Sequence, residues 1–122
     1  MREILIKTNS TIQDALVKLQ NSSLKCLIVT NKKNILLGTI NDGDVRRAIL
    51  KNAKLSSKIV KYYKKNCYFI RYREISKINT SEKLKKLKIN LIPIVDKNKK
   101  VIDYVADNVN LTNPSSKNNK KI

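Results

Sequence analysis

One short stretch of the sequence, residues 38–50, carries the side chains best suited to bind a small molecule. Asn41 and Asp44 lie where an apolar, strand-like segment gives way to a helix-like one. A carboxylate there can accept hydrogen bonds from a ribose diol, and a helix N-terminus favours a phosphate beside it. Arg46 and Arg47 follow, and their guanidinium groups could neutralise that phosphate. The same residue types also cap helices and form turns, so the residues alone leave two interpretations open, nucleotide binding and structural capping.

Gly38 lies in the strand-like part of the same stretch. A glycine inside a strand often marks a place where a ligand or another backbone approaches closely, because it has no Cβ atom. We therefore expect close packing against Gly38.

The sequence contains no recognisable catalytic or metal-binding motif. It has no histidine and only two glycines, and it lacks a Gly-x-Ser-x-Gly turn, a P-loop and a Gly-x-Gly-x-x-Gly loop. Cys26 and Cys67 form no Cys-x-x-Cys pair, so we expect two reduced, strand-borne thiols and neither a disulfide nor a zinc site. We therefore expect no catalytic residues, no metal and no required cofactor in this chain.

The composition favours a small α/β domain. Hydrophobic residues make up 41% of the chain and aromatic residues 5%, so the core must consist mainly of Ile, Leu and Val. Such a composition favours strands packed on helices over a helical bundle. No apolar run approaches the roughly 20 residues that span a bilayer, and the N-terminus does not resemble a signal peptide. We expect a cytoplasmic protein with no membrane partner.

The chain is strongly basic, with a formal net charge of +18. Its lysines occur in nearly every segment, which indicates a bias of the whole sequence. Nucleic-acid-binding surfaces usually add arginine clusters, stacking aromatic residues or a known motif, and none is evident. We therefore expect only weak, salt-sensitive attraction of nucleic acids and no specific nucleic-acid partner.

The first half of the chain has the pattern of a strand, a helix, two strands and a second helix. Strands are expected at residues 4–6, 26–29 and 35–40. Ser10 and Gln13 offer a capping box for the first helix, which has one apolar face. That face consists of Ile12, Ala15, Leu16 and Leu19. The second helix is expected at residues 45–50, with Asp42 or Asp44 near its N-terminus.

The second half repeats this pattern in a weaker form. Strands are expected at residues 68–70, 91–95 and 101–105. The helix between the first two begins either at Glu74 or near Thr80, where Asn79 and Glu82 offer a capping box. The two halves align when Val29 is placed over Val95, so a duplicated unit can bury two sheets together.

Residues 51–66, between the halves, are polar and basic. We expect a connecting segment anchored by Leu55, Ile59 and Val60.

The order and spacing of these segments resemble a CBS domain pair, or Bateman module, over roughly residues 1–105. The resemblance is carried by residues 10–16, by residues 91–96 and by residues 41–50. The last of these resembles more narrowly the CBS pairs found ahead of sugar-phosphate nucleotidyltransferase domains. The expected division is a first module at 1–53, a connecting segment at 54–66, a degenerate, truncated second module at 67–105, and a polar tail or linker at 106–122.

The resemblance implies an α/β fold of two modules, each a small sheet with helices on one side, related by pseudo-twofold symmetry. It also implies that AMP, ADP or ATP binds in the cleft between the modules. Asp44 would hold the ribose, and Asn41 stands where the family has Thr or Ser. The first module would further contribute Lys25, Cys26, Thr39, Arg46 and Arg47. The opposite wall would consist of Tyr68, Phe69, Ile89 and Asn90.

The second copy offers no matching pair of residues, since its candidates are Ala106 with Val109 or Asp107 with Asn110. We therefore expect one nucleotide per chain. The resemblance also implies a homodimer and a C-terminal nucleotidyltransferase domain in the same polypeptide. The alternative is a structural dimerisation module with a vestigial nucleotide cleft, which the Asn41 substitution and the degraded second motif favour.

Overall fold

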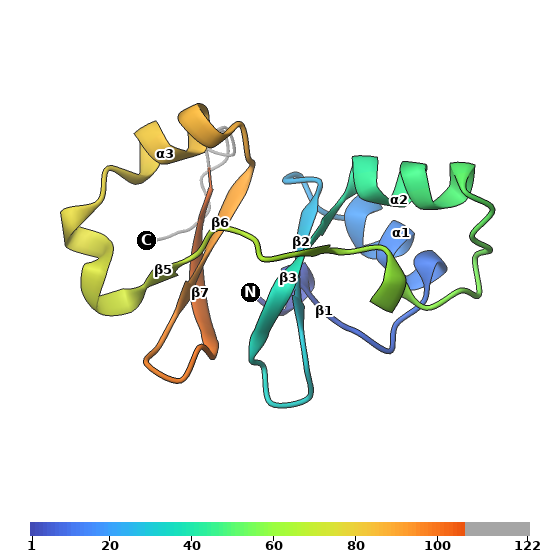
Figure 1. The fold of residues 1–122 in the computed structure, drawn as a ribbon, viewed down its shortest axis with the longest axis horizontal. Coiled ribbons are helices and arrows are strands. Elements are labelled where there is room, and N and C mark those ends of the chain that lie inside the picture. Colours follow the sequence, from blue (N-terminus) through green and yellow to red (C-terminus); the bar gives the residue numbers. More distant parts are fainter. Residues whose placement is uncertain (107–122) are drawn as a thin grey trace.

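Two small β-sheets stand back to back at the centre of the molecule (Figure 1). The structure is a computed structural model that describes residues 1–106. The first sheet consists, in spatial order, of β1 (Leu5–Lys7), β2 (Cys26–Thr30), β3 (Leu36–Asn41) and β4 (Lys64–Lys65). The second consists of β5 (Ile70–Arg71), β6 (Leu91–Val95) and β7 (Val101–Ala106).

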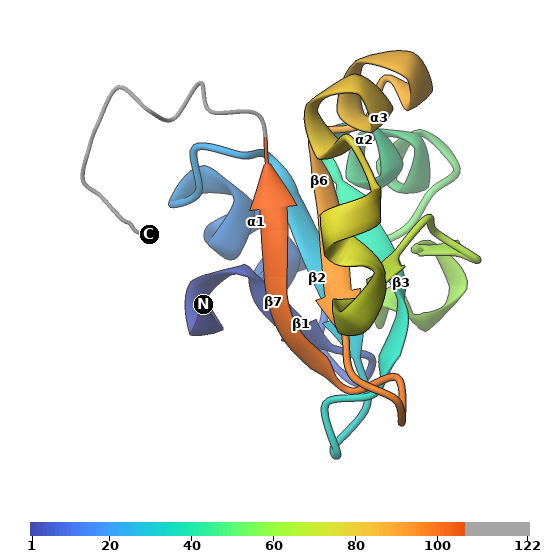
Figure 2. The same ribbon diagram turned by 90° about the vertical axis from the view of Figure 1, so that its left-hand side faces the viewer.

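Helices lie on the outer side of each sheet (Figure 1). Helices α1 (Ile12–Gln20) and α2 (Asp42–Leu50) cover the first sheet, and α3 (Thr80–Leu87) lies against the second. Short 3₁₀ helices are formed by Arg2–Ile4, Ile59–Lys61 and Tyr72–Lys77. Figure 2 shows α3 and the last of these in front of β6, and α3 also contacts β7, whose Val105 packs against the cluster that contains Leu84 of α3. No helix in residues 1–106 has the length and apolar character needed to cross a bilayer.

The two halves share one topology. In each, the first strand pairs in parallel with the central strand, which pairs antiparallel with the next. Even the register shift recurs, between Val29 and Thr30 in β2 and between Ile94 and Val95 in β6. Val95 therefore corresponds to Thr30, and the predicted alignment of Val29 with Val95 was wrong by one residue. The structure thereby confirms the predicted α/β fold built from a repeated strand-helix-strand-strand unit.

The central strands β2 and β6 are buried along their whole length. One face of each packs against the helices of its own half, as Leu27 and Val29 do in the first half. The other face packs between the sheets, where Ile28 meets Leu91 and Val95 in one cluster. Burial on both faces explains why these strands are continuous apolar runs without alternation.

The halves are also joined by hydrogen bonds. The backbone N–H of Leu36 donates to the Lys99 carbonyl (3.0 Å), and that of Val101 donates to the Asn34 carbonyl (2.9 Å). These two bonds link the β2–β3 turn to the β6–β7 turn. At the opposite end of the sheets, the Asn90 side-chain amide donates to the Leu24 carbonyl (3.1 Å).

The first helix begins one residue later than the capping box of Ser10 and Gln13 predicted. Thr11 is the N-cap: its Oγ1 accepts from the Asp14 N–H (3.1 Å), and its own N–H donates to Asp14 Oδ2 (2.9 Å). The expected cap was wrong because the Ser10 backbone is used elsewhere, its carbonyl accepting from the Ile59 N–H (2.9 Å).

The other two helices have polar caps of the same kind. Helix α2 begins at Asp42, three residues before the expected start, because Asn41 caps it. Of the two starts expected for the next helix, the one near Thr80 is confirmed, with Asn79 Oδ1 accepting from the Glu82 N–H (3.0 Å).

The connecting segment is anchored differently than expected. Ile59 is fully buried, but Leu55 is 52% exposed and Val60 is also exposed, so these two expected anchors were wrong. Lys64 and Lys65 at the end of the segment pair with β3 and extend the first sheet. The predicted tail after Ala106, with the candidates Asp107, Val109 and Asn110, lies outside the described residues.

The close approach expected at Gly38 is made by protein backbone. A Cβ atom built on Gly38 would lie 2.1 Å from the Lys64 carbonyl oxygen and 2.9 Å from Cδ2 of Tyr63. Gly38 therefore lets β4 lie against β3. The other glycine, Gly43, has room for a Cβ, its nearest neighbour being Asn41 Oδ1 at 3.4 Å.

We expect Gly38→Ala to destabilise the protein by about 1–3 kcal/mol, because the added methyl group overlaps a backbone carbonyl that cannot move without displacing β4. For a domain of this size that lowers the Tm by roughly 5–15 °C. Gly43→Ala is the matched control and should leave the Tm unchanged or raise it slightly, since alanine is favoured within a helix. Equal melting temperatures for the two variants in circular dichroism would contradict this account of Gly38.

Candidate functional site

A cleft of about 560 Å³ lies between the two halves. This volume is within the range of roughly 300–1,000 Å³ typical of small-molecule sites. The strands of the first sheet contribute Cys26, Thr39, Asn41 and Lys64. The chain that crosses to the second sheet contributes Asn66, Cys67, Tyr68 and Phe69. The end of α3, the turn after it and the start of β6 contribute Leu87, Lys88, Ile89, Asn90 and Leu91.

The cleft brings together most of the residues singled out in the sequence. Those that line it are Cys26, Thr39, Asn41, Tyr68, Phe69, Ile89 and Asn90. Lys25, Asp44, Arg46 and Arg47 are not among the lining residues. Their part in ligand binding stays a prediction.

The walls of the cleft depend on two irregular segments. Asn66 has a left-handed backbone (φ 60°), and there the chain leaves β4 toward the second sheet. The strand predicted at residues 68–70 begins only at Ile70, as β5, so the prediction was wrong for Tyr68 and Phe69, which precede it. Lys88 is also left-handed (φ 56°) and ends α3 at the opposite wall.

The two aromatic side chains of the cleft are held by cations of the second half. Lys83 Nζ lies 5.6 Å from the centre of the Tyr68 ring. Lys99 Nζ and Arg71 Cζ lie 5.1 Å and 5.6 Å from the centre of the Phe69 ring. Such cation–π contacts favour one ring orientation, which suits a surface on which a flat ligand stacks.

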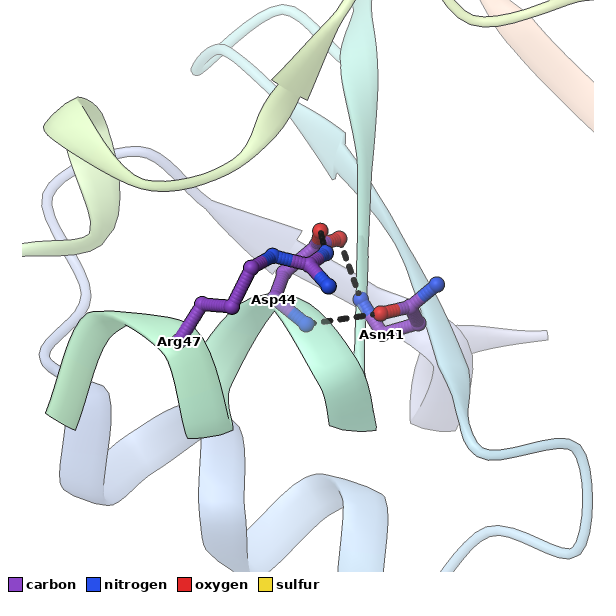
Figure 3. Close-up of polar contacts among 3 residues, drawn as sticks. All are labelled: Asn41, Asp44 and Arg47. Carbon is purple, nitrogen blue, oxygen red and sulfur yellow. Dashed lines mark hydrogen bonds and ion pairs between the residues drawn. The ribbon is translucent and has the colours of Figure 1, made fainter. Parts of the chain in front are cut away.

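Asp44 performs the capping role that the sequence left open (Figure 3). Its N–H donates to Asn41 Oδ1 (2.8 Å), and its Oδ2 accepts from the Asn41 N–H (3.0 Å). Its other oxygen, Oδ1, pairs with Arg47 Nη2 at 2.6 Å. The carboxylate is 13% exposed. Both of its oxygens are thus already engaged, although each keeps a free lone pair for a ligand hydroxyl.

The two neighbouring basic residues of the expected site have other contacts. Arg46 Nη2 lies 3.9 Å from Asp42 Oδ2, and both side chains are well exposed. Lys25 is exposed, and its carbonyl accepts from the Asp42 N–H (3.3 Å), which ties the start of α2 to the start of β2.

Both cysteines line the cleft as free thiols. Burial raises the pKa of Cys26 to about 12, and burial also raises the pKa of Cys67. Both are therefore neutral at physiological pH and offer little nucleophilic reactivity. Cys26 begins β2 as expected, but Cys67 lies on the irregular chain between β4 and β5 and is only half-buried.

Sequence reasoning missed several lining residues, chiefly Lys64, Asn66, Cys67 and Lys88. One signal was available, since a chain that crosses from one module to the other must pass the space between them. Because residues 51–66 are polar and basic, the sequence indicated only a connecting segment there and no part of the cleft wall.

Comparison with known proteins finds a family model that matches part of the chain. Residues 1–51 match the family model of the CBS domain. Two proteins of Helicobacter pylori, each described as uncharacterized, are 32% identical over 98 residues, which is 80% of this chain and 30% of theirs. The chain thus spans about a third of the length of the curated relatives it matches.

Solved structures extend the likeness to both halves. The CBS domain pair of protein MJ0100, in complex with 5′-methylthioadenosine and S-adenosyl-L-methionine, has a TM-score of 0.69 at 23% identity, covering 84% of this chain and 83% of that one. The CBS domain protein PAE2072 from Pyrobaculum aerophilum, complexed with AMP, has a TM-score of 0.66 at 13% identity, with 84% and 79% covered. Residues 1–51 thus match the CBS domain in sequence, and the described chain as a whole has the fold of a CBS domain pair.

Proposed function

We propose that this chain is a non-catalytic regulatory unit that binds one adenosine nucleotide, AMP, ADP or ATP, in the cleft between its two halves. The observation that carries the proposal is the origin of the cleft walls, which come from β2, β3 and β4 on one side and from residues 87–91 on the other. A ligand there contacts both halves at once. Its binding therefore favours one arrangement of the halves over others, which is what a regulatory unit requires.

The residues of the cleft suit such a ligand. Tyr68 and Phe69 offer aromatic faces to the base, and Thr39 and Asn41 offer hydrogen-bonding side chains beside it. In this proposal Asp44, one helical turn from the Asn41 cap, holds the ribose through the lone pairs that Asn41 and Arg47 leave free. AMP, 5′-methylthioadenosine and S-adenosyl-L-methionine, the ligands in the two similar structures, all contain adenine joined to a ribose ring with free 2′ and 3′ hydroxyls.

We further propose that the unit acts within a longer cytoplasmic protein, as the N-terminal part of a sugar-phosphate nucleotidyltransferase. The greater length of the Helicobacter pylori relatives and the resemblance carried by residues 41–50 support this. In that architecture 1–53 and 67–105 are the two modules, and β4 within the connecting segment belongs to the first sheet. Assaying nucleotidyltransferase activity of the full-length protein with and without AMP tests the link.

A second candidate function is a structural dimerisation module with a vestigial cleft. The engagement of Asp44 by Asn41 and Arg47 favours it, because a carboxylate used for capping needs no ligand. Apolar side chains exposed on the outer helices, among them Val17 on α1 and Leu50 on α2, which is 76% exposed, offer a surface for a second copy. Both candidates predict a homodimer, so ligand binding is the property that separates them.

We expect AMP, ADP or ATP to raise the Tm by an amount that grows with the logarithm of the nucleotide concentration. A ligand that binds only the folded state adds about 2.7 kcal/mol at a hundred times its Kd. Calorimetry should give one nucleotide per chain. If none of the three nucleotides changes the Tm at millimolar concentration, the structural dimerisation module is the remaining function. If calorimetry gives two equivalent nucleotide sites per chain, the second copy of the motif is not degenerate.

Asp44→Asn is expected to weaken nucleotide binding tenfold to a hundredfold. Charge-assisted hydrogen bonds contribute about 1.5–3 kcal/mol, and about 1.4 kcal/mol corresponds to a factor of ten in Kd. The helix should persist, because the asparagine oxygen can still accept from the Asn41 N–H.

The matched control is Asp14→Asn. Asp14 has the same position in the capping box of α1 and does not line the cleft. The Asp14→Asn variant should lower the Tm about as much as Asp44→Asn does and leave the Kd for the nucleotide unchanged. If Asp44→Asn binds as tightly as the wild type, Asp44 acts as a cap alone.

A further inference from the structure

The adenosine derivatives in the similar structures differ in charge. AMP is an anion, 5′-methylthioadenosine is neutral, and S-adenosyl-L-methionine carries a sulfonium cation. A cleft that recognises adenosine alone would accept all three. The charges that line the cleft therefore decide which of them this chain prefers.

The charged side chains that line the cleft are two lysines. Lys64 comes from β4 in the first half, and Lys88 comes from the end of α3 in the second, so they approach from opposite walls. No aspartate or glutamate of the described residues lines the cleft. Asp44, next to the cap residue Asn41, is already paired with Arg47 at 2.6 Å.

Neither lysine is neutralised by another part of the described chain. The ion pairs in residues 1–106 join the N-terminus to Glu3, Arg46 to Asp42 and Arg47 to Asp44, and none involves Lys64 or Lys88. Burial raises the pKa of the Cys26 and Cys67 thiols, the Asp44 carboxylate raises that of Cys26 further, and Lys64 partly offsets the rise at both. The side chains that line the cleft thus carry net positive charge, which attracts anions.

We infer that this cleft selects phosphorylated adenosine ligands, whose phosphates lie between Lys64 and Lys88, over neutral and cationic adenosine derivatives. The inference rests on the proposed binding of adenosine nucleotides and names the ligand class of that site. It assigns the phosphate to these two lysines instead of Arg46 and Arg47, which pair with Asp42 and Asp44. Because the lysines belong to different halves, the phosphate also joins the halves electrostatically.

The test compares the binding of AMP, 5′-methylthioadenosine and S-adenosyl-L-methionine to the wild type, Lys64→Gln, Lys88→Gln and the double variant by calorimetry. Wild type should bind AMP at least tenfold more tightly than either other ligand. Each single variant should weaken AMP binding roughly threefold to tenfold, as expected for losing one exposed charge-assisted contact. The binding of 5′-methylthioadenosine should change less than twofold. Raising the salt concentration should weaken AMP binding alone.

Lys32→Gln is the matched control. Lys32 is exposed in the β2–β3 turn, at the opposite end of the hairpin from Cys26 and Asn41. The variant has the same change in net charge and should bind AMP as the wild type does. If it weakens AMP binding as much as Lys64→Gln, the net charge of the chain and not the cleft lysines selects the ligand.

Charge reversal sharpens the test, since Lys64→Glu with Lys88→Glu should bind S-adenosyl-L-methionine more tightly than AMP. Binding of all three ligands with equal affinity to the wild type overturns the inference and leaves the proposed function standing. Binding of none of them overturns both. Melting curves of every variant confirm that the comparison is made on folded protein.

Discussion

Burial of the second face of each sheet is the constraint on which the rest of this molecule depends. Sheets of three or four strands, whose edge strands β1, β4 and β5 have only two or three residues, are not stable unless a layer packs on them. The helices of each half cover one face only, and the other half covers the second. The cleft lies at one end of this contact, because Cys26 and Leu91, which begin β2 and β6, belong to both the contact and the cleft wall.

The sequence predicted those helices and strands that depend on local residue types or on a periodic apolar pattern. The apolar runs of β2 and β6 and the turns that follow them could be predicted because burial on both faces removes polar residues from the strand. The cap of α1 could not be placed to the residue, since Ser10 with Gln13 and Thr11 with Asp14 offer similar chemistry. The choice is made by a tertiary contact, the hydrogen bond from the Ile59 N–H to the Ser10 carbonyl.

The residues of the candidate site also fall into those that could be predicted from the sequence and those that could not. Asn41 was found because it lies at a strand end and helix start that the sequence marks. Cys26, Thr39, Tyr68, Phe69, Ile89 and Asn90 were found because the family resemblance points to them. Lys64 and Lys88 were missed because their places depend on where an irregular chain crosses and where a left-handed residue ends a helix. Asp44 is a different case. Capping and ligand binding need the same carboxylate at the same place, so no local pattern separates the two roles.

The two backbone hydrogen bonds between the β2–β3 and β6–β7 turns make that end of the sheet pair a pivot. At the cleft end, the described residues form one hydrogen bond between the halves, which the Asn90 side-chain amide donates to the Leu24 carbonyl. Any change in the angle between the sheets is therefore largest beside the cleft and smallest at the turns. Strand β7 ends at Ala106, opposite Leu91 in the cleft wall, so the polypeptide leaves the second sheet from the end that swings furthest. Under the proposed function, a ligand in the cleft therefore acts on the position of Ala106 more than on the turns at the far end of the sheets.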